Sequence, residues 1–450
     1  MRTNASINMT QGRPTGLLLR FAIPMLIGNI FQQAYSLADS VIVGQFVGAS
    51  ALAAVGSTGS VTFLFFSVCN GIASGSGIVT SQYFGAGDPM KTKTAIANAA
   101  YIMFAASLVM GVIAFLAAPA VLGLMETPPE VLADATLYMR MSCIGVPLVA
   151  VYNYASSMLR ALGDSRTPLY FLILSCLLNI ALDIFCVRTL QLGVFGAALA
   201  TIIAQVIAGI GCLLYALKTN PYFQLSRENM RPDWRVIGKS VRLGLPLAMQ
   251  WSMIAVSTTA LQAFVNSFGT EAMAAFTATN RIEQLVHQPY NSIGAALATY
   301  TGQNYGAGNM KRVKEGFRHG MLLSAIFTLL MMVAYQLLSE PIMRLFVKET
   351  EVITMGAQAL RLTSWFYIFL AVIYMSRGVL NGIGDALFAF INGIVEVICR
   401  IGLPLLLVLI PGIGLWSIWW TAGVTWLISG LSCLMRYFVW RRKAEAQIAE

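Results

Sequence analysis

Long hydrophobic stretches, separated by short polar ones, follow one another along almost the whole chain. Each is long enough for an α-helix to cross the hydrocarbon core of a membrane, which takes about 20 residues. The pattern therefore predicts an all-α integral membrane protein with twelve transmembrane helices. The expected spans are 16–40, 51–80, 95–120, 133–160, 167–190, 194–217, 238–265, 272–302, 313–338, 354–381, 387–411 and 416–440.

The two halves of the sequence resemble each other. At a shift of 221 residues, SQYFGAGD at 81–88 aligns with GQNYGAGN at 302–309, and Gly163 falls on Gly384. Pro24 and Pro246, each inside a predicted span, match at a shift of 222. Each half holds six spans, an even number, so both halves enter the membrane in the same orientation. We expect two pseudo-symmetric six-helix bundles related by an axis along the membrane normal.

The repeat divides the chain into two lobes. We predict an N-terminal lobe over 1–217, a polar and basic cytoplasmic linker over 218–237, and a C-terminal lobe over 238–450 that ends in a short basic tail. Two similar lobes can enclose a cleft that opens to either side of the membrane, which is a recurrent design of transporters. The alternative is a gene duplication that produced a purely structural bundle.

Composition and charge agree with a membrane location. Only 11% of the residues are charged, against about 25% in soluble domains. The net charge is +10, but Lys and Arg concentrate on the tails and the predicted inner loops. Arg188, Arg344 and Lys348 fall on outer loops, and Arg281 and Arg400 fall within spans. This asymmetry places both termini in the cytoplasm, and it indicates contact with anionic lipid, not with nucleic acid.

Two acidic residues lie deep in the spans of the first lobe. Asp39 is on the first helix, where Gln32 and Tyr35 precede it by seven and four residues and share its face. Asp183 is on the fifth helix, four residues after Asn179. Ionisable side chains at such depth are costly, and they are functional by default in membrane proteins.

Two more helices of the first lobe carry polar residues, Asn153 on the fourth and Thr201 on the sixth. We expect these groups to face Asp39 and Asp183 inside the lobe. Two buried carboxylates cannot both be charged without a partner, and a proton or a bound Na⁺ supplies one. The pocket is therefore a candidate cation site. The alternative is a hydrogen-bonded network that only holds the helices in register.

The second lobe carries different buried charges. Glu283 and His287 share a face of the eighth helix, and Glu396 and Arg400 share a face of the eleventh. In the simpler interpretation Glu396 pairs with Arg400 and neutralises it. In the other, Glu283 or Glu396 helps to hold a cationic substrate.

Nothing in the sequence indicates an enzyme. The chain has two histidines, His287 and His319, and no metal-ligand spacing. It also has no nucleotide-binding P-loop motif. We expect no cofactor other than a coupling ion.

Six segments follow one another in a characteristic order: GRPTGLLLRFAIPMLIGN, ADSVIVGQFVG, SQYFGAGD, RALGDSRTP, NRIEQ and GQNYGAGN. Together they resemble the multidrug and toxic compound extrusion (MATE) family, in its prokaryotic branch. The resemblance implies an antiporter of the cell inner membrane that exports organic cations in exchange for H⁺ or Na⁺ by alternating access. We expect a monomer. The alternative is a flippase for lipid-linked precursors, from the same superfamily.

The resemblance also implies roles for individual residues. Asp39, Asn179, Asp183 and Thr201 match the family's cation site, and they would be the ligands if the ion is Na⁺. Gln32 and Asn153 match residues that line the same cavity. Some relatives carry acidic residues on the seventh and tenth helices. This chain has apolar residues at those places, near Ile254 and Ala371, so we do not expect a second cation site of that type.

Overall fold

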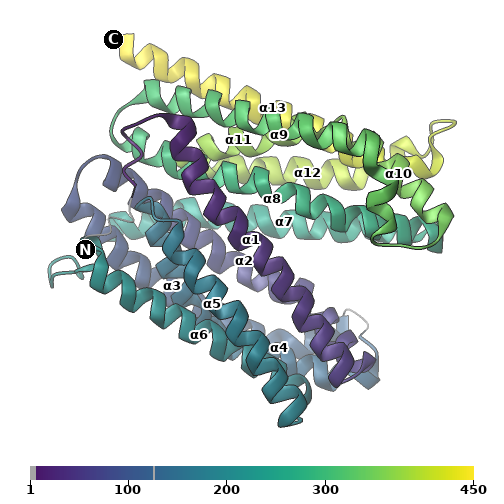
Figure 1. Cartoon of the computed structure of the whole chain (residues 1–450). Coiled ribbons are helices and arrows are strands. Elements are labelled where there is room, and N and C mark those ends of the chain that lie inside the picture. The colour runs from purple at the N-terminus through teal and green to yellow at the C-terminus, as the bar shows by residue number, and fades with distance from the viewer. Residues whose placement is uncertain (1–6, 125–126, 450) are drawn as a thin grey trace. The chain divides into compact units, whose positions relative to one another are not determined.

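The computed structural model describes residues 7–124 and 127–449, which are almost entirely helical (Figure 1). The helices of the first half are α1 (Pro14–Phe46), α2 (Ala49–Gly85), α3 (Pro89–Leu124), α4 (Pro129–Ala161), α5 (Arg166–Asp183) with a π-helical turn (Ile184–Thr189), and α6 (Gly193–Thr219). Those of the second half are α7 (Trp234–Asn266), α8 (Thr270–Gly306), α9 (Met310–Arg344), α10 (Thr350–Ser364), α11 (Tyr367–Ile383), α12 (Ala386–Leu407) and α13 (Ser417–Ala449).

Each predicted span coincides with one of these helices or with a pair of them. In the described part of the chain, nine helices are long and apolar enough to cross a membrane. The helices α10 and α11 meet the same criterion only together, as a pair bent by 52°, and they make a tenth crossing if the pair is one span. The other two predicted spans are α7 and α8, which carry more polar side chains, so a total of twelve crossings stays a prediction.

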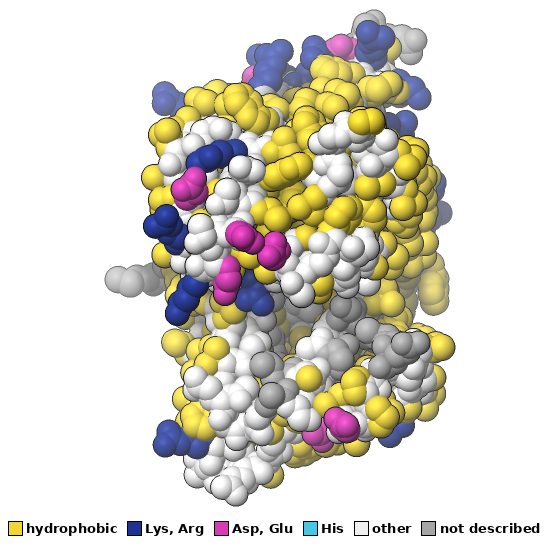
Figure 2. Space-filling view, turned by 90° about the vertical axis from the view of Figure 1, so that its right-hand side faces the viewer, with side chains coloured by type: hydrophobic (Ala, Val, Ile, Leu, Met, Phe, Trp, Pro, Cys, Tyr) yellow, Lys and Arg dark blue, Asp and Glu magenta, His cyan; other side chains and the backbone are white. Residues whose placement is uncertain are grey.

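The surface of the helices is suited to lipid. On α9 the exposed large side chains are all aliphatic over three turns, including Leu322, Ile326, Leu330 and Val333. Figure 2 shows broad hydrophobic areas in which charged side chains are few. Apolar side chains on the outside of long helices are what a hydrocarbon environment requires, so the chain is a multi-pass membrane protein.

The chain folds into two compact units. Unit 1 consists of residues up to Met9 together with Ile23–Met249, and unit 2 of Thr10–Ala22 together with Gln250–Glu450. The division passes through α1 and α7, so each of these helices contributes to both units. Both helices contain a proline close to the division, Pro24 in α1 and Pro246 in α7. The lobe boundaries at 217 and 238 stay predictions.

Unit 1 is held together by small residues on α6. Ala200, Ala204 and Ala208 recur every four residues along one buried face of this helix. The absence of longer side chains lets the backbones approach closely. A Cβ atom added at Gly209 would lie 2.9 Å from the backbone nitrogen of Tyr152 on α4. α4 is the central helix of the unit, because it packs against α2, α3 and α6.

The first half of α7 also packs on unit 1 through glycines. A Cβ atom added at Gly71 on α2 would lie 2.5 Å from the Ala248 nitrogen, and one added at Gly75 would lie 2.4 Å from the Gly244 nitrogen. Only residues without a side chain allow these backbones to come so close. The predicted linker is fixed to the same unit, since Asn98 on α3 accepts a hydrogen bond from the Asp233 N–H at 2.9 Å.

Unit 2 repeats the packing of unit 1. Here α11 takes the place of α4 and packs against α8, α9 and α13. A Cβ atom added at Gly378 on α11 would lie 2.7 Å from the carbonyl oxygen of Gly294 on α8. The start of α1 belongs to this unit, where Thr15 Oγ1 lies 2.8 Å from His319 Nδ1. The internal repeat therefore extends from the sequence to the packing of helices within each unit.

Candidate functional site

Two acidic side chains meet inside unit 1. Asp39 comes from α1 and Asp183 from the last residue of α5, and their carboxyl groups lie within hydrogen-bonding reach of each other. Asp183 has no solvent-exposed surface, and Asp39 Oδ1 is buried without a hydrogen-bond partner. Two carboxyl groups can bond to each other only if one of them carries a proton. The two acids lie together inside the unit, and their role as a cation site stays a prediction.

A threonine links the neighbouring polar residues of this pair. Asn179 Nδ2 donates a hydrogen bond to Thr201 Oγ1 at 3.2 Å, and the Tyr35 hydroxyl lies 3.4 Å from the same oxygen. The Thr201 hydroxyl itself donates to the Ala197 carbonyl at 3.1 Å. Three helices, α1, α5 and α6, thus contribute to one cluster. We call Tyr35, Asp39, Asn179, Asp183 and Thr201 the acidic cluster.

The backbone changes immediately after the second acid. The α-helix ends at Asp183 and continues as the π-helical turn Ile184–Thr189. The Leu190 N–H bonds to the Phe185 carbonyl at 3.0 Å, five residues back. Such turns are rare and frequent at functional sites. A wider turn alters the direction of the side chains that follow, and here it begins at the residue directly after the acid.

Sequence reasoning missed one neighbour of the acidic cluster. Tyr138 on α4 interacts electrostatically with Asp39, Asp183 and Tyr35. Its side chain packs against a cluster of buried aliphatic residues that includes Val43. No spacing rule connects it to the acids, because it lies on a different helix. Of the other predicted cavity residues, Gln32 is exposed on α1 and Asn153 is partly buried on α4, and their role stays a prediction.

The acidic cluster has the chemistry of a site for a small hard cation. Its oxygens come from carboxylates, an amide and hydroxyls, which are ligand types that bind protons or alkali metal ions. Within residues 7–124 and 127–449, no three His, Cys, Asp or Glu side chains converge as they would around a transition metal. Hydrophobic residues, among them Ile42 and Val187, pack beside the cluster and limit the competing access of water.

The buried charges of unit 2 form a second group. Glu396 on α12 accepts hydrogen bonds from Arg377 on α11 and from Ser429 on α13. The Arg400 guanidinium lies further away, with its Nη2 3.9 Å from Glu396 Oε2. Asn392, one turn before Glu396, also accepts from Arg377 and donates to the Ser432 hydroxyl at 2.8 Å. We call Arg377, Asn392, Glu396 and Arg400 the arginine cluster.

This arrangement differs from the expectations in two respects. Arg377 was not among the predicted site residues, yet its side chain is a buried partner of Glu396. The predicted pairing of Glu396 with Arg400 is only the weaker of the two ion pairs. Arg377 is a charged residue within the predicted span 354–381, and this position alone could have identified it as a candidate site residue. Glu283 and His287 lie close enough to Arg400 to interact with it electrostatically.

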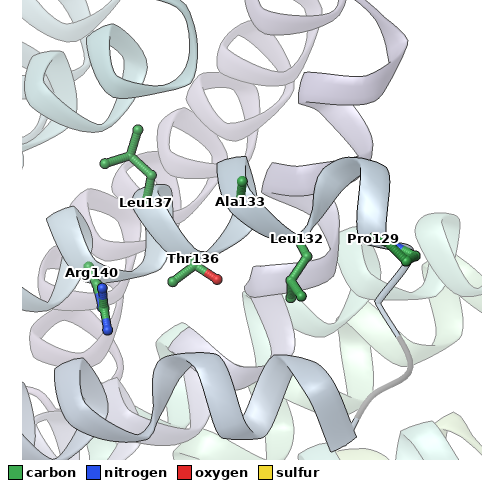
Figure 3. Close-up of a pocket in the computed structure, with 6 residues that line it drawn as sticks. All are labelled: Pro129, Leu132, Ala133, Thr136, Leu137 and Arg140. Atoms are coloured by element: carbon green, nitrogen blue, oxygen red, sulfur yellow. The ribbon is translucent and has the colours of Figure 1, made fainter.

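A pocket of about 420 Å³ is lined by residues that belong to neither cluster. Figure 3 shows that its lining comes from one helix, α4. The residues are Pro129, Leu132, Ala133, Thr136, Leu137 and Arg140. The Arg140 guanidinium lies 5.0 Å from the centre of the Phe115 ring. None of the predicted site residues lines this pocket.

The sequence pattern of the MatE family matches the chain twice, over 24–185 and over 246–406. The offset between the two matches is nearly that of the internal repeat. This finding confirms the resemblance noted in the sequence.

Similar proteins are known over nearly the full length. A probable multidrug resistance protein of Bacillus subtilis, YpnP, is 28% identical over 390 residues, which cover 86% of this chain and 87% of that protein. An FAD transporter of Shewanella oneidensis is 25% identical over 447 residues, 95% of each chain. The fold is similar to that of a MOP superfamily transporter from Pyrococcus furiosus, with a TM-score of 0.89, 23% identity and 99% of each chain covered.

Proposed function

This chain belongs to the MatE family of membrane transporters, and on that premise we propose that it is a secondary antiporter. It exports organic cationic drugs or toxic compounds in exchange for H⁺ or Na⁺ by alternating access. It resides in the cell inner membrane with both termini in the cytoplasm, functions as a monomer and is not an enzyme. The similarity to a multidrug resistance protein over most of both chains supports this substrate class.

The observation that carries the proposal is the contact between Asp39 and Asp183. Their carboxyl groups approach each other in a buried place where one negative charge must be neutralised. A proton or a Na⁺ ion bound between them performs this neutralisation. When the ion leaves, the two carboxylates repel each other and the cluster must rearrange or take up another cation. That alternation is what an antiporter needs to couple two opposed fluxes.

Each member of the acidic cluster has a role in this scheme. Asp39 and Asp183 hold the charge of the ion. Thr201 and Asn179 supply neutral oxygens and fix the spacing between α5 and α6 through their hydrogen bond. Tyr35 and Tyr138 interact with the acids from α1 and α4. If the ion is Na⁺, the oxygens of Asp39, Asn179, Asp183 and Thr201 are its ligands.

The proposal is tested by transport in everted membrane vesicles. An H⁺ gradient and a Na⁺ gradient are imposed separately, and uptake of a fluorescent organic cation is followed. We expect one gradient to drive uptake and Asp39→Asn to abolish it. Asp134→Asn serves as the control, because Asp134 is an exposed acid on α4. Normal gradient-driven uptake by Asp39→Asn would remove the acidic cluster from the mechanism.

A further inference from the structure

Unit 2 contains polar atoms that are buried without a partner. Arg400 Nε, Glu283 Oε1 and His287 Nε2 are each inaccessible to solvent and lack a hydrogen bond. Glu283 and His287 on α8 each interact electrostatically with Arg400 on α12. An unsatisfied buried polar group is costly, and it calls for an explanation such as an absent ligand. Here a donor, Arg400 Nε, and an acceptor, Glu283 Oε1, both lack a partner in the same unit.

The two arginines near Glu396 differ in how closely they contact it. Arg377 takes the close contact with Glu396 and also bonds to Asn392. Arg400 Nη2 is 3.9 Å from Glu396, which is beyond hydrogen-bonding distance. The Nε of Arg400 has no hydrogen-bond partner, so this donor is available to a ligand. The Arg400 side chain is 14% exposed, so it is mostly buried and keeps a small accessible surface.

The acidic counterpart of Arg400 is Glu283. One of its oxygens lies within hydrogen-bonding reach of Thr363, and the other, Oε1, has no partner. The formal charges of this group sum to zero, because it contains two arginines and two glutamates: Arg377, Arg400, Glu283 and Glu396. A purely cationic ligand would add an uncompensated charge to it, and uncompensated buried charge is strongly unfavourable. A ligand that carries one charge of each sign would add none.

Aromatic rings surround these groups. The His287 ring meets Trp426 at 5.7 Å and Tyr374 at 6.4 Å, in edge-to-face geometry. Tyr374 in turn stacks on Tyr290 at 6.3 Å and interacts electrostatically with Arg400. Rings in such arrangements provide flat apolar surface next to the charged atoms. They suit a ligand with an aromatic body.

We propose that unit 2 holds a binding site for aromatic zwitterions. In this site Arg400 binds the carboxylate of the compound, Glu283 binds its cationic nitrogen, and the rings of Trp426 and Tyr374 contact its aromatic body. The inference rests on the proposed export function and narrows its substrate class, because the acidic cluster of unit 1 contains no arginine that could recognise an acid group. Arg377 and Ser429 bond to Glu396, which leaves the more distant Arg400 available to the ligand.

The test compares two dyes that differ by one group. Rhodamine 110 carries a cationic xanthene and a free carboxylate, and rhodamine 123 is its methyl ester. Their dissociation constants for the purified full-length protein are measured by fluorescence anisotropy. A charge-assisted hydrogen bond predicts that the wild type binds the acid about 10-fold to 100-fold more tightly than the ester. Arg400→Gln should reduce this ratio to near one.

Three further variants separate the contact from a general loss of structure. Arg436→Gln removes an ion-paired but exposed arginine of the same unit and should leave the ratio unchanged. Glu283→Gln should weaken both dyes about equally, because both carry the cation. Arg400→Lys keeps a charge but has fewer donors, and it should give an intermediate ratio even if Arg400→Gln does not fold.

Two results would overturn the proposed site. They are a ratio near one in the wild type, and a ratio that Arg400→Gln and Arg400→Lys both leave intact. The outcome is separable from that of the proposed function. Ion-driven uptake of rhodamine 123 together with an unchanged ratio would refute only the zwitterion site. Absence of ion-driven uptake of either dye, together with a ratio that depends on Arg400, would refute only the antiport.

Discussion

The buried ion pairs of unit 2 allow a sharp prediction about stability. Glu396 is held by Arg377 and lies near Arg400, and the side chains of Arg377 and Glu396 are only 12% and 6% exposed. Glu396→Gln removes the negative charge and leaves two arginines close together in a place with little water. Breaking a buried pair in this way costs about 3–5 kcal/mol of unfolding free energy.

The structure also predicts that a second substitution rescues the first. Adding Arg377→Gln to Glu396→Gln restores the net charge of the wild-type cluster. We expect the double variant to be more stable than Glu396→Gln alone by about 1–3 kcal/mol, the usual size of coupling between contacting groups. The amide that replaces the Glu396 carboxylate can still accept the hydrogen bond that Ser429 donates in the wild type.

The pair of Arg436 and Asp385 is the matched control, because it is more exposed than the pair of Arg377 and Glu396: Asp385 is 19% exposed. Its atoms are close, 2.7 Å apart, but the arginine side chain is 43% exposed. Removing Asp385 should cost at most about 1 kcal/mol. Denaturant unfolding of the purified variants in detergent micelles measures all of these values. The reasoning fails if the double variant is no more stable than Glu396→Gln, because the costs would then be independent of the charge balance.

Three other predictions concern packing and the acidic cluster. Gly75→Ala places a Cβ 2.4 Å from the Gly244 nitrogen and 2.7 Å from the Ser240 carbonyl oxygen. Thermal unfolding should therefore show a loss of about 1–3 kcal/mol in the free energy of unfolding. Gly59→Ala on the same helix meets open space and should leave that free energy unchanged. Thr201→Val removes the hydroxyl that accepts from Asn179 and should weaken the apparent affinity for the coupling ion about 10-fold. Thr201→Ser should retain that affinity, and equal values for both variants would contradict the role of the hydroxyl. Asn98→Ala deletes the bonds from α3 to the Arg231 carbonyl and the Asp233 N–H, and limited proteolysis should then cut the linker faster than in the wild type.

Much of the helical framework was predictable because hydrophobic length is a local property of the sequence. The bend between α10 and α11 was not, and 354–381 was expected to be one continuous helix. The break falls at Trp365 and Phe366, where the sequence has neither proline nor glycine. The Phe366 ring lies against Gly423 of α13, so packing with a distant helix determines the local geometry there.

The two clusters differ in how far sequence spacing reveals them. The pairs Asn179 with Asp183 and Glu396 with Arg400 are four residues apart, so the helical period places each pair on one face. The bond between Arg377 and Glu396, and the approach of Tyr138 to Asp39, join different helices. Such contacts depend on how the helices are rotated against each other, and a single sequence does not contain that information. The π-helical turn after Asp183 likewise has no marker in the sequence.

The central claim is that Asp39 and Asp183 hold the coupling ion and release it in exchange for substrate. It is tested most directly by measuring ion release from purified protein when a transported organic cation is added. A pH-indicator dye in weakly buffered solution reports protons, and equilibrium binding of radioactive Na⁺ reports sodium. The account predicts release of one of these ions from the wild type and from Asp134→Asn, and none from Asp39→Asn. Undiminished release from Asp39→Asn and from Asp183→Asn would contradict it.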